Sequence, residues 1–188
     1  MFKKRYLGAA AAFAADHKEL KAIKSKIFNE MGFDKGRAFI YGAKDIDVDV
    51  EEVDRDGEKV LVTKPVNNVV DTDQMTGVSQ YSRYFDRNCA GWEVDPAHNL
   101  AYLSQIQSHM TDLLLTRGHV FLNEVYDAIG LPRSSEGQLV GWVKGAGDNF
   151  VDFGIYNANV PVNRDFINGF ENICLLDFNV DGLVYDKI

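Results

Sequence analysis

Apolar residues recur at helical spacing within the first 31 positions of the chain. They are three or four positions apart, which places them on one face of an α-helix: Leu20, Ile23, Ile27 and Met31. Residues 7–15 before them are mostly alanine, and Gly32 after them can adopt the left-handed conformation that ends a helix. The pattern predicts one amphipathic helix of about 25 residues that ends at Gly32.

A different pattern, the alternation typical of a β-strand, begins near residue 45. Apolar and acidic residues alternate there: Ile46, Val48 and Val50 with Asp45, Asp47, Asp49 and Glu51. Asp56 and Gly57 supply a turn, residues 59–63 return as a second strand, and Pro65 ends it. Residues 38–66 are therefore predicted to form an acidic β-hairpin, which a polar connector follows over residues 67–80.

The acidic face of this hairpin allows three interpretations. Asp47, Asp49 and Glu51 lie on one face of the first strand, at intervals of roughly 7 Å. They can form a solvated face that prevents edge-to-edge pairing of strands. They can instead bind calcium weakly, or they can meet the basic amino-terminal arm of another copy of the chain.

Residues 81–130 predict an extended segment and two helices. Residues 81–88 are aromatic and extended, and Asp95 and Pro96 are typical of the start of a helix. The buried face of that helix follows a helical period before Gly118 closes it: Leu100, Leu103, Ile106, Met110, Leu113 and Leu114. Asn123 is expected to cap a short second helix that stops at Gly130. The acidic residues of that second helix would repel phosphate and argue against DNA reading.

The last 50 residues predict strands and one more short helix. Strands are expected at 139–144 and 150–156 with a turn at 145–148, a helix is expected from Pro161, and a final hairpin is expected from 173–178 and 183–188. The fold class is α+β: a long amino-terminal helix, an acidic β-hairpin, and a carboxy-terminal module of helices packed on a small antiparallel sheet. The predicted domains are a basic helical arm (1–32), the hairpin (38–66) and a compact α+β module (81–188).

Charge separates the arm from the body of the chain. Residues 1–31 hold seven basic and three acidic residues, a net charge of +4, so the other 13 basic and 25 acidic residues give the remainder −12. The basic residues are the candidate interaction residues: Lys3, Lys4, Arg5, Lys18, Lys21, Lys24 and Lys26. They indicate an acidic partner, which can be a neighbouring subunit, a membrane surface or nucleic acid. The acidic body is a poor match for nucleic acid.

The arm also resembles two kinds of membrane-directed segment. A basic start followed by small apolar residues is typical of a signal peptide, but the apolar run of residues 7–15 is far shorter than the roughly 20 residues of a spanning helix. A basic amphipathic helix can also lie in a membrane interface. We favour a helix that docks on protein, and keep interfacial binding as the alternative.

The sequence contains no motif that indicates catalysis or a resident cofactor. His17, His98, His109 and His119 are isolated from one another and lack the spacing of a metal site. Cys89 lies far from the other cysteine, Cys174, and both are expected to be buried free thiols. The segment 177–182 mimics the first half of a calcium loop, but the twelfth position holds Ile188 where a glutamate is required, so a tight turn is predicted. We expect no metal, no cofactor and no enzymatic activity.

Three short segments give the chain a resemblance to a known family. They are YSRYF at 81–85, LNEVYDAIGLP at 122–132 and GQLVGW at 137–142, with an echo in the last fifteen residues. The chain resembles uncharacterised proteins encoded by phages and prophages of Gram-positive bacteria. Related members often carry membrane-spanning segments near the amino terminus, and this chain departs from them because its alanine-rich run is too short to span.

Three functions follow from these features. The resemblance and the opposite charges of arm and body favour a non-enzymatic structural or assembly protein of a phage, present in the virion and, during assembly, in the host cytoplasm. Its partners would be other phage structural proteins or copies of itself, with no specific nucleic acid. The first alternative is a peripheral membrane protein anchored by residues 1–31. The second is a small enzyme or ligand binder that acts on host defence.

Overall fold

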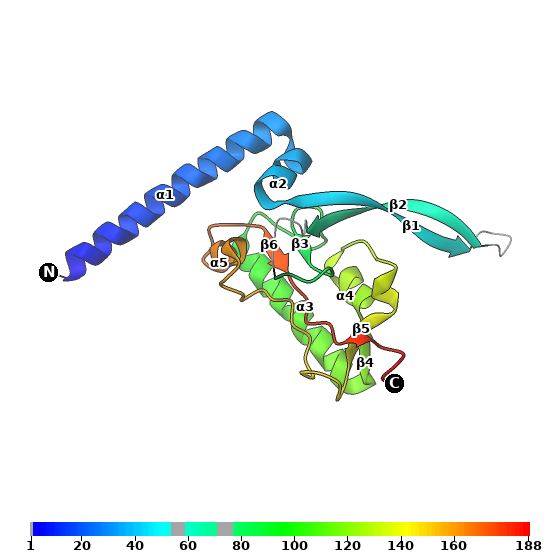
Figure 1. The fold of residues 1–188 in the computed structure, drawn as a ribbon. Coiled ribbons are helices and arrows are strands. Elements are labelled where there is room, and N and C mark those ends of the chain that lie inside the picture. Colours follow the sequence, from blue (N-terminus) through cyan, green and yellow to red (C-terminus); the bar gives the residue numbers. More distant parts are fainter. Residues whose placement is uncertain (1, 54–58, 71–76) are drawn as a thin grey trace. The chain divides into compact units, whose positions relative to one another are not determined.

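The computed structural model describes residues 2–53, 59–70 and 77–188, excluding the side chains of 2–14, 44–46, 48–53, 64–68 and 70. The chain divides into two compact units, Met1–Ala43 and Lys44–Ile188. The first unit is helical, and the second contains all the remaining helices and nearly all of the strand residues (Figure 1). The predicted α+β fold class is confirmed, since helices accompany small antiparallel sheets.

The first unit is built from two helices, α1 (Phe2–Met31) and α2 (Phe33–Tyr41). The predicted end of the first helix is confirmed: Gly32 has φ +80° and its N–H donates to Phe28 O at 3.0 Å. The second helix was not predicted, and the assignment of residues 38–41 to the hairpin was wrong. Gly42 closes α2 with a left-handed conformation and a bond from its N–H to Ala38 O, so the strand begins only after it.

The second unit carries two sheets. The first has the order β1-β2-β3-β6 and the second has the order β4-β5-β7. Their strands are β1 (Ala43–Val53), β2 (Lys59–Val70), β3 (Arg83–Phe85), β6 (Cys174–Leu176), β4 (His119–Phe121), β5 (Val140–Val143) and β7 (Gly182–Leu183). The predicted end of the second strand at Pro65 is wrong, because β2 continues until Val69 pairs with Arg83 of β3. The predicted turn at Asp56 and Gly57 lies outside the described residues.

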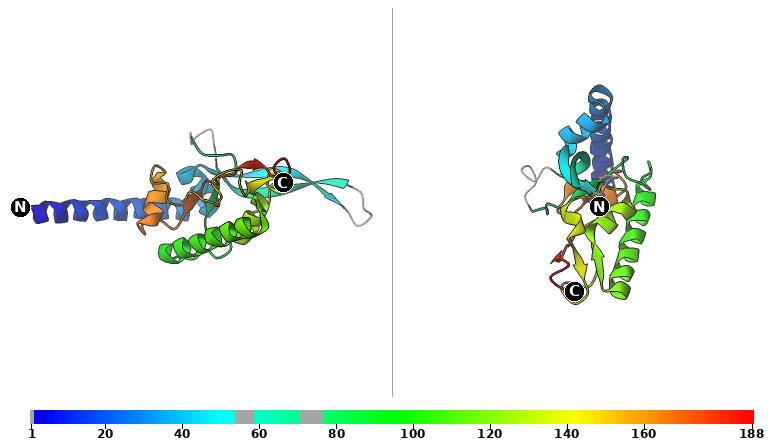
Figure 2. Two further views of the ribbon diagram at one scale, coloured as in Figure 1. Left: turned by 90° about the horizontal axis from the view of Figure 1, so that it is seen from below. Right: turned by 90° about the vertical axis from the view of Figure 1, so that its right-hand side faces the viewer.

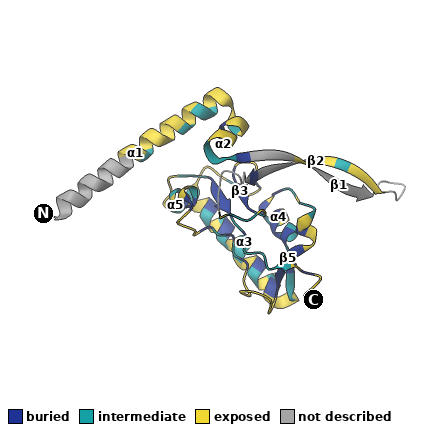
Figure 3. Ribbon diagram, viewed as in Figure 1, coloured by how far each residue is buried: buried dark blue, intermediate teal, exposed yellow. Residues whose placement is uncertain are grey.

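Four helical segments complete the second unit, and the core lies among them. They are α3 (Pro96–Arg117), α4 (Leu122–Ile129), the 3-10 helix η1 (Glu136–Gln138) and α5 (Pro161–Ile167). The two turned views show α3 as a long rod along one side of this unit (Figure 2). The predicted start of α3 is confirmed, since the Asp95 carboxylate accepts a bond from Ala97 N–H at 2.9 Å. The largest fully buried core side chains include Trp142, Tyr126, Phe85 and Phe153. The buried residues are dark blue in Figure 3.

Residues 150–156 do not form the predicted strand. Alternate side chains of the segment are fully buried: Val151, Phe153 and Ile155. Side chains of α3 occupy the main-chain donors of the segment, however: Val151 N–H donates to Thr111 Oγ1 at 3.1 Å and Phe153 N–H donates to Gln107 Oε1 at 2.8 Å. The segment is therefore extended and buried without the ladder that defines a strand.

The predicted final hairpin is also wrong. Strand β6 pairs with β3, whereas β7 pairs with β5, so the two strands belong to different sheets. The segment between them carries the chain from one sheet to the other. The main chain of this segment forms neither a two-residue turn nor a strand ladder. Its polar side chains bind other segments of the unit, as described below.

Candidate interaction surface

In the first unit, helix α2 packs against the carboxyl-terminal part of α1. Phe28 of α1 stacks on Phe33 of α2, with ring centroids 5.4 Å apart. Gly36 lies against the Phe28 ring so closely that an added Cβ would approach it to 2.6 Å. Lys24 places its ammonium 5.0 Å from the centre of the Tyr41 ring. These contacts show that α2 covers the side of α1 that carries Lys24 and Phe28.

A neighbouring side of α1 carries exposed apolar residues. Leu20 is 44% exposed, Ile23 is 57% exposed and Met31 is 43% exposed, and Figure 3 shows this part of α1 as largely exposed. These are three of the four positions from which the sequence predicted an apolar face. Exposed large aliphatic side chains arranged along one face of a helix are typical of a contact surface.

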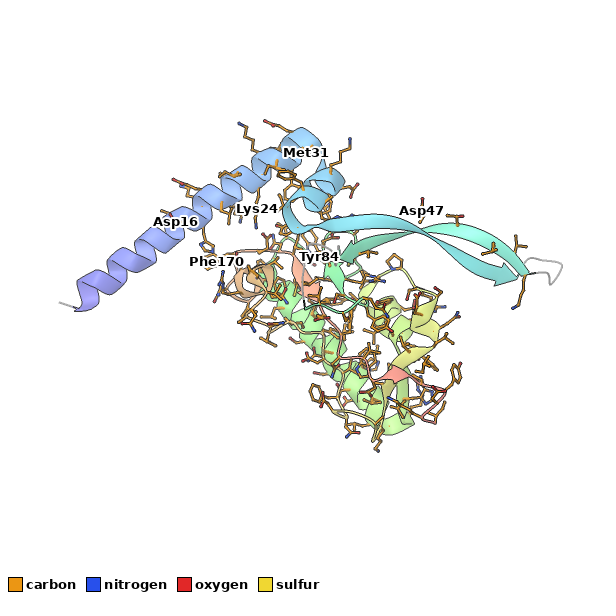
Figure 4. All side chains as sticks on the ribbon, viewed as in Figure 1. Asp16, Lys24, Met31, Asp47, Tyr84 and Phe170 are labelled. Carbon is orange, nitrogen blue, oxygen red and sulfur yellow. The ribbon has the colours of Figure 1, made fainter. Side chains whose placement is uncertain are left out.

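The predicted basic residues of the described part of α1 lie beside this face or on the opposite side of the helix. Lys18, Lys21 and Lys26 are exposed, and Lys26 lies 4.0 Å from the carboxylate of Glu30. Lys24 differs, because it is half-buried and its ammonium lies over the Tyr41 ring. Figure 4 labels Lys24 on α1. At about 100° per residue, Lys21 and Lys26 flank the apolar face, whereas Lys18 lies on the opposite side of the helix. The flanking lysines favour a partner that has negative charge beside an apolar centre.

The other three predicted residues lie in the first turns of α1. Lys3, Lys4 and Arg5 belong to the helix, so their Cα positions continue the same rod. Their side chains lie outside the description. Their role as interaction residues stays a prediction.

Sequence reasoning missed the part of the surface that α2 provides. Phe39 is 71% exposed, the largest exposed fraction among the aromatic side chains described as exposed. Arg37 is buried and lies 3.8 Å from Asp34 and 5.8 Å from the Phe33 ring. The sequence does contain a signal for α2: Gly32 and Gly42 can each end a helix, and nine residues lie between them, enough for a short helix.

The motif of the resemblance at 122–132 serves the scaffold. Helix α4 begins at Leu122, so the prediction that Asn123 caps it was wrong. The Asn123 amide instead accepts a bond from Ser134 N–H and donates one to Ser134 O, both at 2.9 Å. Glu124 accepts the Phe121 N–H at 2.8 Å, which completes the first turn. The Tyr126 hydroxyl donates to Tyr81 O at 2.7 Å and ties α4 to the segment before β3.

Both acidic side chains of α4 are paired with arginines. Arg117 donates to Glu124 through two nitrogens, and Arg133 likewise makes a bidentate contact with Asp127. Partial burial raises the pKa of Glu124, but hydrogen bonds from Arg117 and from Phe121 N–H outweigh it, so this pKa lies below the ordinary range of glutamate. These carboxylates are structural partners.

The pairing of Glu124 predicts a pH dependence of stability. A carboxyl whose pKa is lowered by folding stabilises the fold above its unfolded pKa, about 4.3 for glutamate, and loses that contribution as the pH falls through the folded value. Glu124→Gln should lower the free energy of unfolding by about 1 kcal/mol at pH 7, since the pair is partly exposed. The difference from the wild type should shrink below pH 4 in urea titrations. The exposed Glu136→Gln is the control, and an equal pH trend in both variants would contradict the assignment.

Residues 177–182 hold three other segments of the second unit. The Asp177 carboxylate accepts bonds from Ser79 N–H at 3.0 Å and Ser82 Oγ at 2.6 Å. Asn179 Oδ1 accepts bonds from Trp142 Nε1 at 2.8 Å and Asp152 N–H at 2.7 Å.

Asp181 completes this set of contacts, since its Oδ2 accepts the Val143 N–H at 3.0 Å. The polar side chains at the positions that mimic a calcium loop, Asp177, Asn179 and Asp181, thus make hydrogen bonds within the second unit. Asp177 holds the segment before β3, whereas Asn179 and Asp181 both hold β5.

The remaining candidate chemistry is scattered. Cys89 and Cys174 are buried free thiols, as predicted, and burial raises the pKa of Cys174. His98 lies 3.9 Å from Glu93, and His119 meets the Phe121 ring edge-on. Within the described ranges, histidine, cysteine and acidic side chains nowhere form a group of three that could hold a metal ion.

The hydropathy of the helices gives one further observation. Among the residues that the structure describes, none of the helices combines the length and the apolar character needed to cross a membrane.

Among the comparisons with known proteins, the comparison with protein families gave a match. The searches of curated proteins and of solved structures both gave no match. One family, described as "Family of unknown function (DUF6353)", matches residues 1–188. The match extends well beyond the segments that carry the resemblance at 81–142. Because it spans the whole sequence, the chain belongs to the family of unknown function DUF6353.

Proposed function

We propose that the chain is a phage-encoded, non-enzymatic structural or assembly protein whose helix α1 contacts neighbouring subunits. It would act in the host cytoplasm during assembly and remain in the virion. The observation that carries the proposal is the surface of α1. Leu20 and Ile23 are exposed there, and α2 packs on the side of the helix that carries Lys24 and Phe28.

The electrostatics of the chain support a contact with protein. Residues 1–31 carry a net charge of +4 and the remaining residues carry −12, so the arm of one copy is complementary to the body of another. A basic surface next to exposed aliphatic side chains suits an acidic protein surface with an apolar centre. The phage origin rests on the resemblance of segments 81–85, 122–132 and 137–142.

The use of polar side chains in the second unit supports a role without catalysis. Glu124 and Asp127 are bound to arginines, and Asp177 and Asp181 accept bonds from the main chain. A catalytic acid or base must instead keep an atom within reach of a substrate proton.

A fractionated lysate of a phage-producing culture tests the proposal. Mass spectrometry should find the chain in purified particles, and Lys21→Glu should reduce its amount there at least severalfold, because it reverses a charge beside the exposed apolar residues. Lys144→Glu makes the same change of charge on the second unit and should leave incorporation intact. Absence of the wild-type chain from particles would refute the proposal, and recovery with the membranes would favour an interfacial helix.

A further inference from the structure

Helix α5 ends on an asparagine, Asn168, that is followed by a glycine. The Gly169 N–H donates to Phe166 O at 3.0 Å. The Phe170 N–H reaches one residue further back and donates to Asp165 O at 2.8 Å. This pair of bonds is the Schellman motif, in which the turning residue adopts the left-handed region. Gly169 does so with φ +78°, so the motif explains why a glycine follows Asn168.

An asparagine followed by glycine is a chemically reactive pair. The main-chain nitrogen of the following residue can attack the side-chain amide, and glycine has no Cβ to obstruct that attack. Every other asparagine of the sequence is followed by a residue that carries a Cβ. Asn168 is also exposed, so water reaches it. The end of α5 therefore combines the reactive pair with access to solvent.

We propose that Asn168 is a site of spontaneous deamidation. The Gly169 nitrogen forms a bond to Asn168 Cγ and gives up its proton, while Nδ2 leaves as ammonia. Water then opens the resulting five-membered imide ring at either carbonyl. The product is an aspartate, or an isoaspartate whose main chain runs through the β-carbon. The net reaction consumes water and releases ammonia, and it is independent of the proposed function.

The conformation of the last turn sets the rate of this reaction. Asn168 has ψ 0°, which turns the Gly169 nitrogen away from Asn168 Cγ. Ring closure requires rotation about the Cα–C bond of Asn168, which breaks the bond from Gly169 N–H to Phe166 O. The side chain must also leave Arg164 O, to which Nδ2 donates at 2.8 Å. Helix ends open locally at low cost, so the folded chain reacts, but more slowly than the unfolded chain.

Asn163 of the same helix is the contrasting case. It is 1% exposed, and its Nδ2 donates to Gly154 O at 3.0 Å and to Leu175 O at 2.8 Å. Release of this amide would separate α5 from β6, whereas release of the Asn168 amide opens only the last turn. Arg164 also follows Asn163 and carries a Cβ. The fold therefore protects one asparagine of α5 and leaves the other reactive.

The product is expected to weaken the end of α5. A carboxylate at position 168 cannot donate to Arg164 O, and its negative charge lies at the negative end of the helix. Asn168→Asp reproduces the aspartate product. It should raise the equilibrium constant for unfolding about two- to fivefold in urea titrations. An unchanged constant would overturn the expected effect of the product.

Incubation of the full-length folded chain for days at mildly alkaline pH tests the proposal. Peptide mass spectrometry should find that Asn168 is converted about tenfold faster than Asn157, an exposed asparagine that Ala158 follows. Asn157 is the matched control in the same molecule. Asn168→Gln should abolish conversion at this position, because a longer side chain closes its ring much more slowly.

The same measurement in urea separates the chemistry from the fold. Conversion of Asn168 should be faster in urea than in buffer, because the last turn of α5 is then open. Equal conversion of Asn168 and Asn157 in the folded chain would overturn the proposal, and so would an Asn168 that reacts only in urea. Equal rates for Asn168 in urea and in buffer would overturn the role of the last turn.

Discussion

Asn163→Ala is expected to lower the free energy of unfolding of the second unit by about 3 kcal/mol. Asn163 is 1% exposed, and its amide binds both sides of one residue of β6: it accepts Leu175 N–H and donates to Leu175 O, both at 2.8 Å. It also donates to Gly154 O at 3.0 Å. Alanine would remove this partner from the buried N–H and C=O of Leu175, at a cost of about 1–3 kcal/mol for each group that finds no water, whereas Gly154 O still accepts Asn157 N–H at 3.1 Å.

Asn168→Ala is the matched control, and urea denaturation of both variants is the measurement. Asn168 closes the same helix, but it is exposed and makes one side-chain bond, to Arg164 O at 2.8 Å. Its loss should lower stability by less than about 1 kcal/mol. Similar losses in the two variants would show that the Asn163 amide does not hold β6 to α5.

The helices could be predicted from the sequence because their signals are local. Asp95 and Pro96 begin α3 and Gly118 ends it, as the residue types indicated. Gly32 likewise ends α1. Each of these residues acts on main-chain groups within one turn of itself, so a single sequence contains the information.

The strands were harder to predict because they depend on distant partners. Residues 150–156 are extended, but Gln107 and Thr111 of α3 accept hydrogen bonds from the main-chain donors that a strand would use. The last two strands joined different sheets because Asp177 and Asn179 hold segments that are far away in the chain. None of these contacts is visible in the spacing of residues.

The candidate surface was predicted in part for the same reason. The period of Leu20 and Ile23 and the lysines around them are local properties of α1, so they were found. Helix α2 and the contact of Lys24 with Tyr41 depend on a turn at Gly32, which could equally have ended the helical part of the arm. In the described structure, the exposed Leu20 and Ile23 thus lie on a different side of α1 from Phe28, which packs against α2.

Trp142→Ala is expected to have the other large effect, a loss of about 4 kcal/mol in the free energy of unfolding of the second unit. Trp142 is 1% exposed in the core, and truncating a buried tryptophan to alanine removes about 3–5 kcal/mol. Its Nε1–H also donates to Asn179 Oδ1 at 2.8 Å, which joins β5 to the segment between β6 and β7.

Trp142→Phe separates the ring from the hydrogen bond. It keeps most of the buried area and removes the donor, while Asn179 Oδ1 still accepts Asp152 N–H at 2.7 Å. The expected loss is therefore smaller, about 1–2 kcal/mol. Trp92→Phe removes a comparable bond, from Trp92 Nε1 to Asn172 O at 2.8 Å, at a part-buried position and should cost less. Equal losses for the alanine and phenylalanine variants in urea titrations would mean that the bond to Asn179, rather than packing of the ring, stabilises the second sheet.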